Sequence, residues 1–261
     1  MVDVNNQLSI IIYSCWNNRK MWDVFLKLFR KFWEDCKYKL ILLTDKYEGN
    51  YTEYDFDEIV VLDSSWEKMI MKGIETANTP YVMLWMDDYL LCDYVKNEDI
   101  DNYLEYAKRY NAANIRLVES SIIPSETYKA DSQFNYYEPG TAYSMSTQIG
   151  IWDVEFLKQN IKTDWSAWEF ERRGSLEIRD YEHPLLAPKN YSFPYEEGVR
   201  KGKWMVGGVN LCKRNGIDVA ITGKPVMSSM EMAWIYFKGA ILELNPTLVV
   251  KIQNLLAKQK K

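Results

Sequence analysis

The stretch Thr79-Pro-Tyr-Val-Met-Leu-Trp-Met-Asp-Asp-Tyr-Leu-Leu91 contains the clearest structural signal in this chain. Residues 81–86 form an unbroken apolar run, which is typical of a central strand in a parallel sheet covered on both faces. The run leads directly into two adjacent carboxylates, Asp87 and Asp88. In open α/β sheets, ligands bind at the carboxyl ends of such strands. The two acids therefore either hold a divalent cation, which prefers carboxylate oxygens, or belong to a solvated turn.

The chain on either side of this stretch alternates between strand and helix patterns. Strands are expected at residues 8–13, 38–43, 58–62, 81–86 and 114–118, and helices at residues 21–33, 66–78 and 100–111. Repeated β-α-β units imply a parallel sheet with right-handed crossovers. Three of the first four strands end at an acid, namely Asp45, Asp63 and Asp87. The predicted fold class is α/β, with a mostly parallel central sheet flanked by helices.

The second half of the chain has a less regular pattern. Residues 124–140 are polar and aromatic and are expected to form a long loop, whereas residues 143–152 are expected to be extended. Short helices are expected at residues 154–160 and 166–173. Residues 246–261 combine apolar positions at helical spacing with lysines, which predicts a basic amphipathic helix that docks on the core or lies on a membrane surface. The Met- and aromatic-rich residues 227–237 are a candidate interface.

Composition limits the classes of function. With a net charge of -5 and a pI of about 5.2, the chain is not expected to bind nucleic acid. Its 4 cysteines show neither metal-ligand spacing nor a disulfide framework, which fits a reducing, cytoplasmic setting. The first residues lack a signal-peptide pattern, and no segment approaches the roughly 20 apolar residues of a membrane span. A soluble or peripheral protein is expected.

A second acidic site lies in the segment Asp164-Trp-Ser-Ala-Trp-Glu-Phe-Glu171. Glu169 and Glu171 lie near the start of a predicted helix, next to Trp168. Either carboxylate is a candidate general base toward a sugar hydroxyl, with a Trp face stacking on the sugar ring. However, Ser166-x-x-Glu169 also matches a capping box, in which Glu169 only satisfies backbone amides at the helix start.

Two further features are candidate site elements. His183, the only histidine, is either a metal ligand beside the acid pair or a structural residue. The segment Gly198-Val-Arg-Lys-Gly-Lys-Trp204 is basic and contains two glycines, so Arg200 and Lys203 are candidates to bind a diphosphate; the alternative is an exposed turn. The segment does not match a P-loop, and no Gly-x-Gly-x-x-Gly follows the first strand, which argues against a dinucleotide enzyme.

Taken in order, these motifs resemble those of a GT-A glycosyltransferase, of the small bacterial type found with capsule and lipopolysaccharide clusters. The resemblance covers roughly residues 7–210. The segment Ser9-Ile-Ile-Ile-Tyr-Ser-Cys-Trp-Asn17 resembles the first strand of that family, which packs against the nucleotide base. The resemblance implies the following nucleotide-binding residues: Tyr13, Cys15, Asp45, Asp63, Arg200 and Lys203.

Residues 75–88 resemble the helix and strand that precede the acidic metal motif of the family. That motif usually reads Asp-x-Asp; here Trp85 takes the first position, followed by Met86, Asp87 and Asp88. The resemblance implies Mg²⁺ or Mn²⁺ held by Asp87 and Asp88, with His183 as a further candidate ligand. The segment 168–171 resembles the acidic segment that supplies the catalytic base in inverting members, which often reads Glu-Asp. The implied acceptor-binding residues are Gln148, Trp152 and Trp168.

The resemblance also implies a domain organisation. A GT-A (Rossmann-like) domain is expected over residues 1–225, with a nucleotide-binding half at about 1–95 and an acceptor-binding half at about 96–225; a C-terminal helical extension follows at 226–261. The implied activity is transfer of a sugar, with inversion, from a nucleotide-sugar donor, a UDP-sugar being favoured. The acceptor is a glycan or lipid-linked glycan in surface polysaccharide synthesis. The basic C-terminal helix is expected to permit contact with the inner face of the cell membrane.

Two other functions remain open at this point. A nucleotidyltransferase also uses a parallel sheet and acids on a metal, but it usually has a Gly-rich loop after the first strand, and residues 14–20 contain no glycine. The second alternative is a non-catalytic sugar-binding protein that has lost its active site. The absence of the first acid of the motif is consistent with this alternative. Retention of Asp87, Asp88 and Glu169 argues against it.

Overall fold

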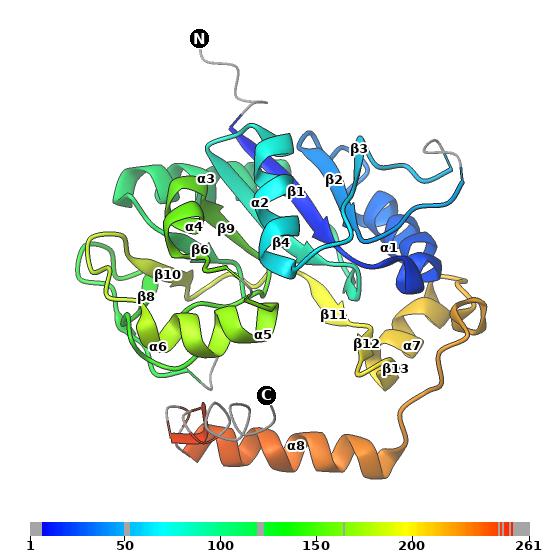
Figure 1. Cartoon of the computed structure of the whole chain (residues 1–261). Coiled ribbons are helices and arrows are strands. Elements are labelled where there is room, and N and C mark those ends of the chain that lie inside the picture. Colours follow the sequence, from blue (N-terminus) through cyan, green and yellow to red (C-terminus); the bar gives the residue numbers. More distant parts are fainter. Residues whose placement is uncertain are drawn as a thin grey trace.

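The computed structural model describes residues 7–49, 53–118, 123–163, 165–244, 246, 248–250 and 252. A nine-stranded sheet runs through it in the order β3-β2-β1-β4-β9-β6-β10-β8-β7 (Figure 1). Its strands are β1 (Leu8–Tyr13), β2 (Lys39–Thr44), β3 (Glu58–Val61), β4 (Tyr81–Met86), β6 (Asn114–Arg116), β7 (Glu126–Thr127), β8 (Phe134–Tyr137), β9 (Gly150–Asp153) and β10 (Leu185–Pro188). All of these except β8 and β9 run in the same direction. The prediction of an α/β fold with a mostly parallel central sheet is confirmed.

Helices cover both faces of the sheet. They are α1 (Arg19–Phe32), α2 (Trp66–Ala77), α3 (Asn97–Tyr110), α4 (Val154–Asn160) and a continuous helix made of α5 (Ala167–Glu169), η3 (Phe170–Gly174) and α6 (Ser175–Glu177). The alternation along β1 shows the two layers, because successive side chains in a strand point to opposite faces. Ile10 and Ile12 pack into the cluster that includes α1 and α3, whereas Ile11 packs into the cluster of α2, α4 and the continuous helix.

Within the expected extended segment 143–152, only the residues from Gly150 onward form a strand, and the expected loop at residues 124–140 is also wrong. The segment 124–140 contains β7 and β8, and β8 pairs in antiparallel fashion with β10. Phe134 is fully buried and lies edge-on to Tyr106 of α3, with ring centroids 5.1 Å apart. The aromatic residues of this segment therefore pack against α3 as part of the core, which the polar residues between them concealed.

Strand β9 joins the two halves of the chain into one sheet. It lies antiparallel between β4 and β6, so that Trp152 is paired with Val82 on one side and with Asn114 on the other. Gly150 begins this strand at a very close approach: a Cβ added there would lie 3.0 Å from the carbonyl oxygen of Ile115 and 3.1 Å from the Cα of Arg116. The absence of a side chain at Gly150 is thus what allows β6 and β9 to pair.

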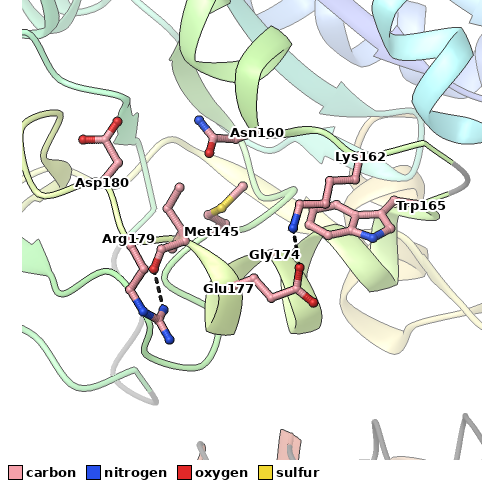
Figure 2. Close-up of a pocket in the computed structure, with 9 residues that line it drawn as sticks. Met145, Asn160, Lys162, Trp165, Gly174, Glu177, Arg179 and Asp180 are labelled. Atoms are coloured by element: carbon pink, nitrogen blue, oxygen red, sulfur yellow. Dashed lines mark hydrogen bonds and ion pairs between the residues drawn. The ribbon is translucent and has the colours of Figure 1, made fainter.

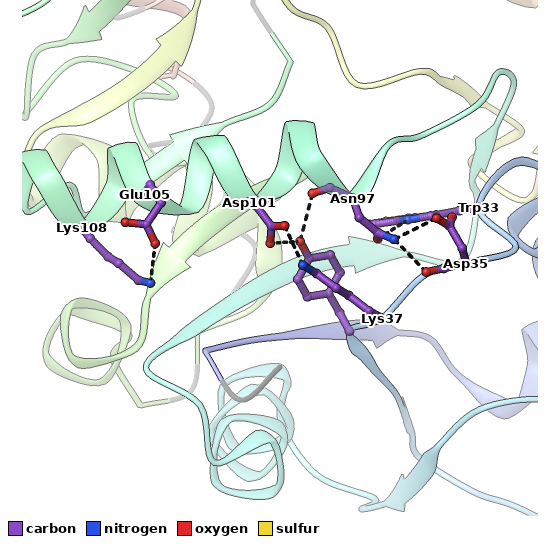
Figure 3. A network of polar contacts seen from close by, with 8 residues as sticks. Trp33, Asp35, Lys37, Asn97, Asp101, Glu105 and Lys108 are labelled. Carbon is purple, nitrogen blue, oxygen red and sulfur yellow. Dashed lines mark hydrogen bonds and ion pairs between the residues drawn. The ribbon is translucent and has the colours of Figure 1, made fainter. Parts of the chain in front are cut away.

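A polar network ties the end of α1 to the start of α3 (Figure 3). The indole nitrogen of Trp33 donates to Asn97 Oδ1 at 2.9 Å, and Asn97 Nδ2 donates to the carbonyl oxygen of Asp35 at 2.8 Å. Asp101 accepts from Lys37 Nζ at 2.6 Å and from the Tyr38 hydroxyl at 2.8 Å. These contacts hold two helices of the same layer against the first strands.

The remaining elements lie beyond the carboxyl ends of the parallel strands. They are the ribbon of β5 (Tyr89–Leu91) and β11 (Tyr195–Glu197), the ribbon of β12 (Val199–Arg200) and β13 (Lys203–Trp204), α7 (Val206–Arg214), η4 (Val219–Thr222) and α8 (Ser229–Leu244). Figure 1 shows α8 running below the sheet, apart from the helices that cover it. The basic helix expected at residues 246–261 lies largely outside the described residues. Within the described part of the chain, no helix has both the length and the apolar character needed to cross a membrane.

We predict that Gly150→Ala lowers the free energy of unfolding by about 1–3 kcal/mol, because the new methyl group presses on backbone atoms that have no room to move. Urea denaturation followed by tryptophan fluorescence measures the change. An unaltered free energy of unfolding contradicts the close approach of β6 and β9 described above.

Candidate functional site

The expected site acids gather at the carboxyl edge of the parallel strands. Asp45 follows β2, Asp87 follows β4, and Ser14 follows β1, which lies between those two strands. Because parallel strands present their carboxyl ends at one edge, these side chains lie together. Asp63 is at the same edge but near β3, the outermost strand, and it is exposed.

Asp87 is buried, with 3% of its surface exposed, and is held by a hydrogen-bond relay. The Ser14 hydroxyl donates to Asp87 Oδ2 at 2.6 Å, and the Trp22 indole nitrogen of α1 donates to the same hydroxyl oxygen at 2.7 Å. Asp88 is partly buried, and its Oδ1 is buried with no hydrogen-bond partner among the described residues. Burial is the main cause that raises the pKa of both carboxyls, and the charge of Asp87 raises that of Asp88 further. A nearby positive charge would therefore stabilise the ionised form of the pair.

A divalent cation fits this pair of acids. The unpartnered Oδ1 of Asp88 and the adjacent Asp87 carboxylate are oxygen ligands of the kind that Mg²⁺ and Mn²⁺ prefer. No cluster of three or more His, Cys, Asp and Glu side chains suited to a metal occurs in the described part of the chain. A cation held here would take its other ligands from substrate phosphates and water, which is how Mg²⁺ is usually bound.

His183 does not belong to this site, and its assignment as a ligand beside Asp87 and Asp88 is wrong. Leu185 of β10 is level with Val82 of β4 through the intervening pairs of β6 and β9. His183 precedes Leu185, whereas Asp87 follows Val82, so roughly 20 Å separates them along the strand direction at about 3.3 Å per residue. At its own edge of the sheet, His183 Nδ1 lies 2.7 Å from Asp180 Oδ2.

Three expected nucleotide-binding residues do surround the acid pair. Asp45 Oδ1 accepts a hydrogen bond from the backbone nitrogen of Trp16 at 2.6 Å, which fixes the turn η2 (Trp16–Asn18) after β1. Tyr13 and Cys15 are partly buried beside it, and burial is the first cause that raises the pKa of each. The negative charges of Asp45 and Asp87 raise both pKa values further, which shows that the four side chains share one electrostatic environment.

The ribbon of β5 and β11 forms one wall of the site. Glu197 pairs with Tyr89, the residue that follows Asp88, and the backbone nitrogen of Gly198 donates to the carbonyl oxygen of Asp88 at 2.7 Å. A side chain at position 198 would collide with Leu90, so this contact depends on glycine. The negative charge of Glu197 is one of the causes that raise the pKa of Asp88.

The two basic residues expected to bind a diphosphate are each paired with an acid. Arg200 makes a two-pronged ion pair with Glu197, and its Nε donates to Glu197 Oε1 at 2.6 Å. Lys203 Nζ lies 2.5 Å from Glu231 Oε1 at the start of α8. Arg200 therefore lies close to the acid pair through Glu197, whereas the charge of Lys203 is directed toward α8.

Glu169 forms the capping box that its sequence context allowed. Its Oε2 accepts from the backbone nitrogen and the hydroxyl of Ser166, both at 3.0 Å, and the Ser166 hydroxyl oxygen accepts from the backbone nitrogen of Glu169 at 3.2 Å. Its Oε1 lies 3.8 Å from Arg173. These contacts give Glu169 a structural role at the start of the helix.

Glu171 is held instead by hydrogen bonds from the segment just before β9. Its Oε1 accepts from the backbone nitrogen of Thr147 at 2.7 Å, from the Thr147 hydroxyl at 2.8 Å and from the Ser146 hydroxyl at 3.1 Å. Thr147 lines a small cavity together with Tyr13 and Met86, the residue before Asp87. The charge of Glu171 also helps to raise the pKa of Tyr89, behind burial and Tyr195. Glu171 is thus linked through Thr147 to the side chains near the end of β4.

The helix that carries Glu171 is wound as a π-helix over Phe170–Gly174. Such turns are rare, and they occur frequently at functional sites. The wider turn alters the spacing of side chains along the helix, so that Glu169 stays at the helix start while Glu171 reaches Thr147. No local sequence signal indicated this winding.

Arg116, at the end of β6, braces the segment that holds Glu171. It is 1% exposed, and its Nη2 donates to the carbonyl oxygens of Tyr143 at 2.8 Å and Ser144 at 3.0 Å. Its guanidinium lies 4.6 Å from the ring centre of Tyr137. Burial lowers the pKa of Arg116, and the negative charge of Glu171 partly offsets this lowering.

The acceptor-binding candidates divide into one buried and two accessible residues. Trp152 is fully buried in β9 and packs on Phe156 and Phe170, so it has no face for a ligand and its assignment to acceptor binding is wrong. Trp168 is 67% exposed at the start of the helix that carries Glu171. Gln148 is half-buried and adjoins Thr147, the partner of Glu171.

A cavity of about 270 Å³ lies elsewhere (Figure 2). It is lined by the continuous helix and its flanking turns, including Trp165, Gly174 and Asp180. Lys162 and Glu177 form an ion pair at its edge, 2.6 Å apart. Asp180 also binds His183, so this cavity extends toward the opposite edge of the sheet from the acid pair and contains none of the expected site residues.

Lys224 is a site residue that the sequence pattern did not reveal. It lies between η4 and α8, and its Nζ donates to Asn18 Oδ1 at 2.8 Å, in the turn after β1. Its positive charge acts to lower the pKa of both Asp87 and Asp88 against the effect of burial. A lone lysine between Gly223 and Pro225 carries no recognisable motif, so only the fold could place it here.

Comparisons with known proteins give no family assignment. No protein-family model and no curated protein match the chain. Among solved structures, the TarS fragment 1–349 of S. aureus is similar with a TM-score of 0.47 and 12% identity over 72% of this chain and 59% of that one. The same fragment in complex with UDP-GlcNAc gives a TM-score of 0.48 and 13% identity over 76% and 60%.

A cytidylyltransferase from Leptospira borgpetersenii gives a TM-score of 0.43 and 11% identity over 85% of this chain and 99% of that one. The chain spans less than two thirds of the length of the TarS fragment. At these identities and TM-scores, the comparisons assign no activity to the chain.

Proposed function

We propose that the protein is a glycosyltransferase that moves a sugar from a nucleoside diphosphate sugar, with a UDP-sugar favoured, to a hydroxyl of a glycan or lipid-linked glycan in surface polysaccharide synthesis. The observation that supports this proposal is a buried carboxylate pair, with an unpartnered oxygen, at the carboxyl edge of a parallel sheet. A separate hydrogen-bonded carboxylate, that of Glu171, is close enough to Tyr89, the residue after Asp88, to help raise its pKa. The arrangement provides one acidic site for a cation and a second for a base.

In this proposal Asp87 and Asp88 would hold Mg²⁺ or Mn²⁺, which would supply positive charge to the leaving diphosphate. Ser14 keeps Asp87 in position through the hydrogen bond at 2.6 Å. Tyr13, Cys15 and Asp45 border the same pocket and contact the nucleoside. Arg200 holds Glu197 in a two-pronged ion pair beside the acid pair.

Glu171 acts as the general base rather than Glu169. Its three hydrogen bonds in the described structure all fall on Oε1, which orients the carboxylate and leaves Oε2 to accept a proton. Oε2 takes the proton of the acceptor hydroxyl, the hydroxyl oxygen forms a bond to the anomeric carbon, and the bond from that carbon to the diphosphate oxygen breaks. Attack opposite to the leaving group inverts the anomeric configuration. Trp168 and Gln148 lie on the acceptor side.

The C-terminal segment supplies a membrane contact in this proposal. Trp234, Tyr236 and Phe237 of α8 are each more than half exposed. Lysines at positions 251, 258, 260 and 261 follow in the sequence, and their charge complements anionic lipid headgroups. Aromatic side chains with adjacent lysines are typical of segments that bind membrane surfaces.

We predict that Glu171→Gln lowers the rate of sugar transfer by about 10²–10⁴-fold, because the amide cannot accept the proton, while UDP affinity is retained. Glu169→Gln is the matched control: glutamine also completes a capping box, so activity and stability should both persist. Rates are measured by release of nucleoside diphosphate in the presence of acceptor. Loss of activity in the Glu169 variant with a fully active Glu171 variant contradicts the assignment.

We further predict that UDP raises the melting temperature, that Mn²⁺ increases this shift, and that Asp88→Asn abolishes the increase. A ligand that binds only the folded state stabilises it by mass action, and the amide has lost the charge that holds the cation. Asp93→Asn, an exposed acid just after β5, is the control and should behave as the unaltered protein does. An equal Mn²⁺ effect in the Asp88 variant places the metal elsewhere.

For the membrane contact, we predict that the full chain sediments with vesicles that contain phosphatidylglycerol more than with vesicles of phosphatidylcholine alone. Trp234→Ala combined with Phe237→Ala should reduce sedimentation, because two exposed aromatic anchors are lost. Added salt should also weaken binding by screening the lysines. Equal recovery with both vesicle types, or none with either, rejects the contact.

A further inference from the structure

The segment between α7 and α8 brings Lys224 to the turn after β1, near the acid pair. We call residues 218–228 the strap. It begins at Asp218, whose side chain accepts from the backbone nitrogen of Ala220 at 2.9 Å, and it turns sharply at Gly223, where φ is 69°. A positive φ is readily adopted by glycine, so the chain reverses there and presents the next residue, Lys224.

Trp204 anchors the strap. Its indole nitrogen donates to the Thr222 hydroxyl oxygen at 2.9 Å, its backbone nitrogen donates to the carbonyl oxygen of Pro225 at 2.8 Å, and its carbonyl oxygen accepts from Met227 at 2.9 Å. Trp204 is itself fully buried. These three bonds lie on both sides of Lys224 and therefore hold its backbone in one place.

The anchor is linked directly to the acid pair. Met205, which follows Trp204, donates its backbone nitrogen to the carbonyl oxygen of Gly198 at 2.8 Å, and Gly198 donates to the carbonyl oxygen of Asp88 at 2.7 Å. On the other side, Lys224 Nζ reaches Asn18 at 2.8 Å, four residues after Ser14, the partner of Asp87. Lys224 is thus bound from two directions to the segments that carry the two acids.

The side chain of Lys224 has an uncharged hydrogen-bond partner, unlike those of Arg200 and Lys203. Arg200 and Lys203 each face a glutamate, which neutralises their charge locally. The hydrogen-bond partner of the Lys224 side chain in the described structure is the neutral amide oxygen of Asn18. An ammonium group has three donors, so this contact leaves two of them for a ligand.

We propose that Lys224 binds the diphosphate of the nucleotide donor beside the acid pair, an inference that rests on the function proposed above. Two carboxylates and one divalent cation together carry no net charge. The ammonium of Lys224 adds a positive charge beside them, and that charge attracts a diphosphate. The strap therefore adds the positive charge of Lys224 to the site. In this site Trp85 occupies the position where the Asp-x-Asp motif usually has its first Asp.

The test compares UDP, UMP and inorganic pyrophosphate by isothermal titration in the presence of Mn²⁺. Lys224→Met should weaken binding of UDP and of pyrophosphate by about tenfold or more, as expected for loss of a charge-assisted hydrogen bond, while UMP loses much less. Lys224→Arg should restore most of the preference for UDP over UMP. Lys213→Met, an exposed lysine near the end of α7, is the matched control and should leave all three affinities unchanged.

Retained UMP binding by the Lys224→Met protein shows that it is folded. Equal weakening of UDP and UMP, or no weakening of either, overturns the role of Lys224 while leaving the proposed function in place. Absence of UDP and pyrophosphate binding by the unaltered protein overturns both.

Discussion

The structure around the candidate site depends on the burial of negative charge at the end of β4. Moving a carboxylate out of water costs several kcal/mol unless hydrogen bonds or opposite charges offset it, and two adjacent carboxylates also repel each other. Asp87 is partly compensated by Ser14, whose hydroxyl is in turn oriented by Trp22 of α1. Asp88 retains a buried oxygen without a protein partner in the described structure. A positive charge at this point would stabilise the ionised pair, since burial and mutual repulsion both disfavour it.

Several surrounding elements contact the two acids or bring a positive charge near them. The turn after β1 provides Ser14 and Asn18, the ribbon of β5 and β11 fixes the backbone of Asp88, and the strap brings Lys224. These segments are far apart in the sequence, and buried anchors such as Trp204 hold them together. The second carboxylate site is built separately on a helix. There the capping box of Glu169 fixes the helix start. The π-helical turn follows, and Glu171 within it binds Thr147.

Much of the fold could be predicted from local patterns. The apolar runs of β1, β2 and β4, and the acids that follow them, placed Asp45 and Asp87 at one sheet edge, because strand periodicity and the direction of parallel strands are properties of short segments. The capping box at Ser166 and Glu169 was readable for the same reason. By contrast, the position of His183 depends on the direction of β10, and the burial of Trp152 depends on the insertion of β9 between β4 and β6. The π-helical turn and Lys224 result from long-range packing, and no spacing of residue types indicates them.

We propose that Asp87 and Asp88 form a cation site on which a nucleoside diphosphate binds. A crystal structure of the protein grown with UDP and Mn²⁺, measured at a wavelength where manganese scatters anomalously, tests this proposal most directly. We expect one anomalous peak in contact with the carboxylate oxygens of Asp87 or Asp88, with the diphosphate on its other side. A nucleotide bound away from the end of β4, or ordered there without a manganese peak, contradicts it.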